Sequence, residues 1–278
     1  MSVTIFSCPL CKKALSLEDR SYNCSSGHCY DVAKEGYVNL LLANQKNSKQ
    51  PGDSKEMIRS RRSFLDQGYY DPLIAKMIDL LSSVTSGVRN CLDLGCGEGY
   101  YLAKLANAPK LKINNSYGID ISKAAIQLAA KKYTDLSFAV SSSNNLAVLS
   151  GVIDVVVVVF APVNSEELHR IVNESGHVLI VSAGPQHHKE LATMIYDTPR
   201  PHDYDPAENL KSNFQLTNSE QMSFNIELDS SETILQLLQM TPYYWHTSQQ
   251  KLAEIKKLTN LKLSCDFKLS LFQKKNQD

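Results

Sequence analysis

The stretch LDLGCGEGYY, residues 92–101, decides the fold of this chain. Mainly apolar residues from Asn90 to Cys96 predict a strand that opens on alternating glycines, and residues 99–108 then have helical spacing. Glycines at such a strand-to-helix turn let a ligand approach the backbone at the carboxyl edge of a parallel sheet. We therefore expect a ligand-binding cleft directly after this strand.

The spacing of the glycines and two acidic residues indicate the class of ligand. The D-x-G-x-G-x-G run of Asp93, Gly95, Gly97 and Gly99 lacks the G-x-G-x-x-G spacing of a pyrophosphate cradle. The next predicted strand ends with Asp120, about twenty residues after the turn, where a carboxylate can accept both hydroxyls of a ribose. Either acid alone could be a turn former or a helix cap, but the pair at this spacing favours a nucleoside ligand.

Strands and helices alternate on both sides of the glycine turn. The predicted strands are 90–96, 116–121, 136–142, 152–160 and 177–182, and the predicted helices are 71–81, 99–108, 122–133, 165–172 and 188–196. This alternation predicts an α/β fold with a parallel sheet covered on both faces. Five consecutive valines, Val155 to Val159, suit a central strand that is buried on both sides.

The last third of the chain has a different pattern. Residues 214–228 and 261–272 alternate apolar and polar side chains, and the helical stretches 232–240 and 249–258 lie between them. Two late strands separated by helices suit the far edge of the same sheet, with one of them antiparallel.

The N-terminal segment carries five metal-ligand side chains. Cys8-x2-Cys11 is followed after a loop by Cys24-x3-His28, with Cys29 adjacent to the histidine. Two such pairs can close a tetrahedron around zinc, and the ion then supplies folding energy that so short a segment cannot obtain from a core. Cys8, Cys11 and Cys24 are expected ligands, and we favour His28 over Cys29 as the fourth. A closed set of four ligands predicts a structural zinc rather than a catalytic one.

Composition restricts the class of protein further. Of the 278 residues, 43% are hydrophobic and 21% are charged, which is typical of a folded chain. There are 29 lysines and arginines and 29 aspartates and glutamates, so the net charge of the chain does not favour a polyanionic partner. The odd number of cysteines, seven, favours metal binding over a disulfide framework. We find no signal peptide and no membrane span, and we expect a cytoplasmic protein.

A polar, basic segment joins the zinc segment to the predicted sheet. Residues 44–53 have linker composition, and Ser54 can cap a helix that runs to about Leu65. Six basic residues lie between positions 44 and 62: Lys46, Lys49, Lys55, Arg59, Arg61 and Arg62. They predict either a patch that faces nucleic-acid phosphates or a solvated helix face.

Taken together, these motifs resemble a known family. The D-x-G-x-G-x-G turn with a strand-end acid is the S-adenosylmethionine signature of class I methyltransferases. With CPLC, C-x3-H, AKEGYVNLL, PGDS, RR-x-FL, GCGEGYY and MTP, the chain resembles the RlmA-type 23S ribosomal RNA (guanine-N1) methyltransferases of bacteria along essentially its whole length. The resemblance implies a Rossmann-like class I methyltransferase sheet with a small N-terminal zinc-binding module.

The resemblance also implies domain limits and site residues. The zinc-binding module would span residues 1–43, the basic linker and helix 44–68, and the methyltransferase domain 69–278. The zinc ligands would be Cys8, Cys11, Cys24 and His28. The residues implied at the cofactor are Tyr70, Asp93, Gly95, Gly97, Gly99, Tyr100, Asp120, Ser142 and His187, with His188 as an alternative to His187.

The implied activity is methyl transfer from S-adenosylmethionine to N1 of a guanine in a hairpin loop of 23S ribosomal RNA, by a homodimer. The zinc module would serve as an arm for RNA recognition. The segment from Phe160 to Val163 occupies the place of the N-P-P-Y motif used on exocyclic amines, which favours a ring nitrogen. No general base is identified from the sequence. Two alternatives stay open: a small-molecule methyltransferase, and a non-catalytic RNA-binding protein on this fold.

Overall fold

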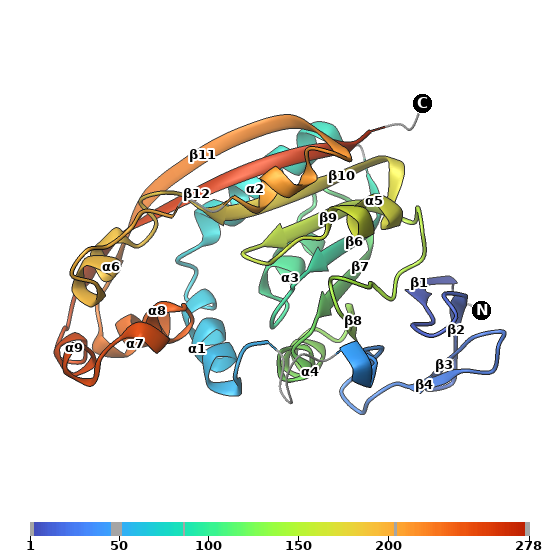
Figure 1. Ribbon diagram of the computed structural model, residues 1–278, viewed down its shortest axis with the longest axis horizontal. Helices are drawn as coiled ribbons and strands as arrows, with labels where there is room; N and C mark the ends of the chain where they lie inside the picture. Colours follow the sequence, from blue (N-terminus) through green and yellow to red (C-terminus); the bar gives the residue numbers. More distant parts are fainter. Residues whose placement is uncertain (1–2, 46–51, 86, 203–204, 276–278) are drawn as a thin grey trace.

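The computed structural model describes residues 3–45, 52–85, 87–202 and 205–275. Within these ranges a small four-stranded sheet lies beside an eight-stranded sheet that carries helices on both faces (Figure 1). No helix in the described ranges is long and apolar enough to cross a bilayer.

The eight-stranded sheet has the order β11-β12-β10-β9-β6-β7-β8-β5. Its strands are β5 (Tyr37–Asn39), β6 (Val88–Leu94), β7 (Ile113–Asp120), β8 (Ser137–Val140), β9 (Ile153–Val159), β10 (Val172–Ala183), β11 (Phe214–Leu228) and β12 (Leu261–Lys274). The neighbouring pairs from β5 to β10 are parallel, whereas β12 is antiparallel to both β10 and β11. The prediction of a mostly parallel sheet with one late antiparallel strand is therefore confirmed.

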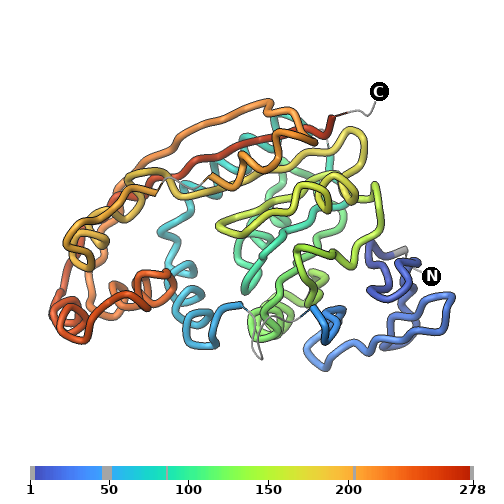
Figure 2. Tube along the Cα trace, in the orientation of Figure 1, coloured from blue at the N-terminus to red at the C-terminus, as the bar shows by residue number. Residues whose placement is uncertain are grey.

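The large sheet separates two apolar cores, one on each of its faces, and helices cover both. The helices are α1 (Lys55–Leu65), α2 (Asp71–Val84), α3 (Tyr100–Ala106), α4 (Lys123–Lys132), α5 (Ser165–Ile171), α6 (Lys189–Ile195), α7 (Ser231–Gln239), α8 (Tyr243–His246) and α9 (Gln249–Ile255), with short 3₁₀ turns at Ala43–Gln45 and Pro206–Leu210. Figure 2 shows α7 to α9, in orange and red, at the opposite end of the molecule from the blue N-terminal segment.

The turns that follow β6, β7, β9 and β10 lie near one another. These strands are neighbours in the sheet and run parallel, so their carboxyl ends meet along the same side of it. At the opposite edge, Asp154 of β9 accepts hydrogen bonds from the Asn90 backbone N–H (2.7 Å) and the Asn173 amide (2.7 Å). This carboxylate therefore ties together the amino-terminal parts of three strands.

The N-terminal module is built from β1 (Val3–Ser7), β2 (Ala14–Glu18), β3 (Ser21–Asn23) and β4 (Cys29–Asp31). The Ser7 backbone N–H donates to the Ala147 carbonyl (3.0 Å), in the loop between β8 and β9. The Phe6 ring packs edge-on against Tyr117 of β7, with the ring centres 5.8 Å apart. The module thus shares one apolar core with the large sheet.

Strand β5 links the two parts. Sequence reasoning groups residues 1–43 together, and within that range β5 pairs in parallel with β8 at the edge of the large sheet. Its last residue, Asn39, lies opposite Val140. Two of the predicted basic residues, Lys46 and Lys49, lie outside the described residues.

Candidate active site and metal centre

The glycine turn after β6 has three glycines with different roles. All three have left-handed backbones, with φ of 77° at Gly95, 55° at Gly97 and 85° at Gly99. A side chain at Gly95 would collide with Ala161 after β9, and one at Gly99 would press on α4 and β8. A Cβ at Gly97 would meet only the Arg61 guanidinium, at 3.6 Å. Gly97 is therefore the glycine that leaves the backbone open toward the cleft.

Asp93, at the end of β6, is a buried carboxylate with an unpartnered oxygen. The residue is 1% exposed, and its Oδ2 has no hydrogen-bond partner among the described residues. Burial, aided by the nearby Asp120 carboxylate, raises the pKa of Asp93 to about 8. A buried carboxylate oxygen without a partner is rare, and a cationic ligand such as an ammonium group would satisfy it.

Asp120 ends β7 and holds the glycine turn in place. Its Oδ2 accepts a hydrogen bond from the Gly97 backbone N–H (2.9 Å), and its Oδ1 accepts one from the Ser122 N–H (2.7 Å). Burial raises the pKa of Asp120, and these two N–H donors oppose that shift. Each oxygen of a carboxylate can accept a second bond, so both remain available to a pair of hydroxyls.

The two predicted tyrosines direct their hydroxyls into the protein. Tyr70 is buried at the start of α2, and its hydroxyl lies 3.0 Å from Nε2 of His188. The hydroxyl of Tyr100 donates to Asp71 Oδ1 (3.0 Å). Tyr100 is the first residue of α3, so its backbone lies at the glycine turn while its ring packs toward α2.

His187 lies in the loop after β10 with a defined tautomer. Its Nδ1 accepts a hydrogen bond from the Asp266 backbone N–H (3.3 Å), so the ring proton of the neutral form is on Nε2. Burial, aided by His202, lowers the pKa of His187 to about 3. The ring stacks on His188, with the ring centres 3.8 Å apart. A neutral His187 of this tautomer can donate a hydrogen bond but cannot accept a proton at Nε2.

Asp266 of β12 fixes the loop that carries His187, a role that sequence reasoning missed. Its carboxylate accepts hydrogen bonds from the Gln186 backbone N–H (2.9 Å), the Gln221 amide (2.9 Å) and the Ser223 hydroxyl (2.8 Å). A Cβ at Gly184 would lie 2.5 Å from its Cγ. The available signal was a buried-strand pattern, CDFKL, interrupted by an acid.

A pocket of about 700 Å³ opens beside Asp120, between α1, α4 and the ends of β5 and β8. Ile121 and Val140 supply apolar surface from the strand ends, and the exposed Trp245 of α8 forms part of the rim. Ser142, which we expect at the cofactor, lies just past β8, and its hydroxyl accepts a bond from the Asn144 N–H (3.2 Å). The pocket therefore adjoins the acid that sequence reasoning assigns to a ribose.

The basic residues of α1 fall into two groups. Arg61 pairs with Asp53 (2.5 Å), and Arg62 lies 3.6 Å from Glu98, a buried residue of the glycine turn. Lys55 and Arg59 are exposed, and among the residues that the structure describes they make no ion pair. Arg61 and Arg62 thus form internal ion pairs at the cleft, whereas the side chains of Lys55 and Arg59 face solvent.

The structure brings four of the five candidate metal ligands together. One ligand atom from each of Cys8, Cys11, Cys24 and His28 lies within 4.8 Å of the others. The sulfurs of Cys11 and Cys24 are 3.7 Å apart, and a zinc tetrahedron with bonds of about 2.3 Å has edges of about 3.8 Å. His28 Nδ1 lies 3.4 Å from the sulfurs of both Cys8 and Cys24. This donor set therefore fits zinc.

The remaining candidate ligand lies outside the cluster. Cys29 is exposed on β4, where it pairs with Asn23 of β3.

The Lys13 backbone N–H lowers the pKa of the Cys11 thiol to about 6, which favours the thiolate that zinc requires. Burial counteracts that shift only in part.

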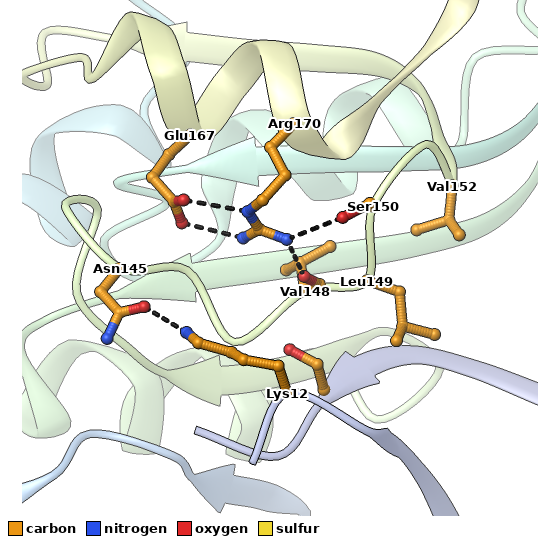
Figure 3. Close-up of a pocket in the computed structure, with 9 residues that line it drawn as sticks. Lys12, Asn145, Val148, Leu149, Ser150, Val152, Glu167 and Arg170 are labelled. Atoms are coloured by element: carbon orange, nitrogen blue, oxygen red, sulfur yellow. Dashed lines mark hydrogen bonds and ion pairs between the residues drawn. The ribbon is translucent and has the colours of Figure 1, made fainter. Parts of the chain in front are cut away.

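A second pocket, of about 550 Å³, lies where the zinc segment meets the large sheet (Figure 3). Lys12 follows the first cysteine pair with a left-handed backbone (φ 61°), and its ammonium group bonds the Asn145 side chain. Arg170 forms a fork with Glu167 (2.8 and 2.9 Å) and donates to the Val148 carbonyl (2.7 Å). Glu167 and Arg170 thus satisfy each other, and the bond from Lys12 to Asn145 joins the module to the loop before β9.

Two family profiles match this chain. The family profile described as RlmA, N-terminal, a zinc ribbon, matches residues 6–49, and a methyltransferase domain profile matches residues 91–180. A 23S rRNA (guanine(748)-N(1))-methyltransferase of Streptomyces fradiae is 30% identical over 254 residues, which cover 88% of each chain.

A chain in the solved complex that contains the Trm112 methyltransferase activator of Haloferax volcanii has the same fold. It is 18% identical, with a TM-score of 0.50, and the match covers 81% of this chain and all of the other.

Proposed function

Because this chain belongs to the RlmA family of methyltransferases, we propose that it transfers a methyl group from S-adenosylmethionine to N1 of a guanine in a hairpin loop of 23S ribosomal RNA. The observation that carries the proposal is the joint presence of a Cys3His cluster and a glycine turn flanked by Asp93 and Asp120. A methyltransferase of small molecules would need no zinc arm.

The residues at the carboxyl edge have separate tasks toward S-adenosylmethionine. Its sulfonium methyl is already activated, so the protein mainly has to bind and orient the two reactants. Asp93 would satisfy the cofactor's ammonium group with its unpartnered oxygen, and Asp120 would accept the ribose hydroxyls. Gly97, which has no side chain, would let the cofactor approach the backbone of the turn.

The other assigned residues support this cleft. We assign cofactor contacts to Tyr70, Gly95, Gly99, Tyr100, Ser142 and His187. His187 acts through Nε2–H, as a hydrogen-bond donor, because its Nδ1 is engaged by the Asp266 N–H. Guanine N1 must lose a proton during transfer, and His187 in this tautomer is a poor acceptor for it.

The zinc centre has a structural task. Cys8, Cys11, Cys24 and His28 would hold one ion, and all four coordination positions would then be filled by protein. Such a site leaves no position for a reactive water, so it stabilises the module rather than takes part in chemistry. The module, docked through Ser7 and Lys12, would present a fixed surface to the RNA.

We assign the domains as residues 1–43, 44–68 and 69–278, with β5 of the first segment completing the sheet of the third. RNA contact is assigned to the exposed Lys55 and Arg59. We further propose a homodimer that forms a shared RNA cleft, acting in the cytoplasm, where ribosomal RNA is available.

The test uses purified protein, radiolabelled S-adenosylmethionine and ribosomal RNA from a strain that lacks the gene. We expect label in N1-methylguanosine after digestion of the RNA to nucleosides. Label that appears only in a metabolite extract would support a small-molecule enzyme instead. Failure to bind S-adenosylmethionine would support a non-catalytic RNA-binding protein.

A further inference from the structure

Phe160 is an exposed aromatic residue at the edge of the sheet where the cofactor turn lies. All eight phenylalanines of the chain fall in the described residues, and Phe160, at 47% exposure, is the exposed one. It follows the central strand β9 directly, after five consecutive valines that are all buried. A ring that leaves this much apolar surface in water is available to contact a ligand.

The backbone holds this ring in an unfavourable conformation. Phe160 has φ of 54°, the left-handed region that a bulky L residue seldom adopts. Its backbone N–H donates to the Val181 carbonyl of β10 (3.0 Å), and the next residue, Ala161, packs on Gly95 of the glycine turn. His188, after the adjacent strand, has the same φ. Strained residues that the surroundings hold in place are characteristic of ligand-binding sites.

Buried aromatic rings pack against Phe160. Its ring centre lies 5.8 Å from that of His187 and 5.9 Å from that of Phe267. Those two rings are 4.7 Å apart, and Phe267 is fully buried. Tyr70 in turn packs edge-on against Phe267, at 5.2 Å. These contacts restrict the orientations of the exposed ring, which lowers the entropy that it loses when another ring stacks on it.

The residues around Phe160 favour a nucleobase over a phosphate as the group that contacts its ring. His187, the polar ring nearest to Phe160, is neutral at physiological pH because burial lowers its pKa to about 3. It therefore offers no positive charge to a phosphate. A base that is splayed out of an RNA loop instead exposes two apolar faces, and proteins recognise such bases by stacking on aromatic side chains.

We propose that Phe160 is the stacking surface for the splayed target guanine and holds its plane beside the glycine turn. The contact of Ala161 with Gly95 places the ring of Phe160 one residue from the glycine turn. This inference rests on the proposed function, because it requires a guanine substrate. It identifies Phe160 as a substrate-positioning residue.

The test is a cycle of two protein variants and two RNAs. The RNAs are the hairpin that contains the methylated guanine, as identified by nucleoside mapping, and the same hairpin with an abasic site there. Phe160→Gly removes the ring and suits the left-handed backbone, so it should not unfold the protein. Phe160→Tyr keeps the ring. Affinities are measured with S-adenosylhomocysteine bound, which prevents turnover.

We expect Phe160→Gly to bind the guanine hairpin roughly ten- to a hundredfold more weakly than the wild type, as is usual for loss of one stacked base. The abasic hairpin should bind both proteins equally, and Phe160→Tyr should behave like the wild type. The affinity for S-adenosylhomocysteine should not change.

Equal weakening of both RNAs by Phe160→Gly would show that the ring only supports the cleft, and would overturn the proposal. Loss of affinity in Phe160→Tyr as large as in Phe160→Gly would also overturn it. If mapping finds no methylated guanine at all, the proposed function itself has failed, which is a separate result.

Discussion

Single charged residues determine how this cleft responds to pH and to its ligand. Asp93 is the clearest case, because burial raises its pKa to about 8 in the folded chain, against 3.8 for the free side chain. Between these values the folded state binds more protons than the unfolded state, so stability falls as pH rises through this window. The cost is fully present above about pH 8.

Asp93→Asn should remove that cost. We expect the unliganded variant to melt several degrees above the wild type at pH 8 and close to it at pH 4. Its affinity for S-adenosylmethionine should fall, because the ammonium group loses a charged partner. Thermal melts at the two pH values and calorimetry check both expectations. A variant that is less stable than the wild type at pH 8 would contradict the role given to the buried carboxylate.

Asp120→Ala should weaken binding of S-adenosylmethionine by at least about tenfold, since each hydrogen bond to a charged acceptor contributes about 1.5 to 3 kcal/mol. Asp154→Ala is the matched control, because Asp154 also accepts two hydrogen bonds but lies at the opposite edge of the sheet. Calorimetry should show unchanged affinity for the control even if its melting temperature falls. Equal losses in both variants would mean that Asp120 acts only on stability.

At the scale of elements, the zinc cluster can be tested independently of the glycine turn. Cys24→Ser should lose the metal and RNA methylation while cofactor binding is largely kept, because the cluster is distinct from the glycine turn. Cys29→Ser is the control and should retain about one zinc per chain, since Cys29 is exposed outside the cluster. Metal analysis of the purified variants measures how much zinc each one holds. Retention of zinc by Cys24→Ser, or its loss from Cys29→Ser, would disprove the ligand set.

Helix α1 allows a second test at this scale. Replacing the exposed Lys55 and Arg59 by Ala should weaken RNA binding and reduce its salt dependence by about 0.7 to 0.9 in log–log slope per lost phosphate contact. Lys256 and Lys257, exposed after α9, form the control pair. Binding is measured over a series of salt concentrations. An unchanged slope in the α1 variant would leave these residues as a solvated face.

Elements were more predictable than contacts between them. The alternation of strands and helices, the five valines and the late antiparallel strand could be read from local pattern, because period and composition reflect burial directly. The role of Asp266 could not, since it bonds residues of β11 and of the loop after β10. Likewise, six basic residues look equivalent in sequence, and only the fold pairs Arg61 with Asp53 and Arg62 with Glu98.

In the candidate site, too, local features were predictable from the sequence and contacts between distant residues were not. The glycine turn and the two acids are close in sequence, so their juxtaposition was predictable. Phe160 was visible only as the first residue of a loop in place of N-P-P-Y. Its exposure and left-handed backbone depend on Val181 and on the packing of Ala161 against Gly95, which are far apart in the chain.

For the whole molecule, the central claim is that a cofactor cleft and a zinc module act together on one guanine of the large-subunit RNA. The two parts share an apolar core and are fixed together through Ser7 and Lys12. A methyl group at N1 blocks the Watson–Crick edge, so the product can be located on the RNA by reverse transcription.

The most direct measurement is therefore a map of reverse-transcriptase stops on 23S ribosomal RNA, with nucleoside mass spectrometry of the same samples. We predict a stop one nucleotide before a hairpin-loop guanine, together with N1-methylguanosine. Both should be absent in a deletion strain and return with the wild-type gene but not with Asp120→Ala. An unchanged stop in the deletion strain, or the loss of N2-methylguanosine or of a cytidine modification instead, would contradict the account.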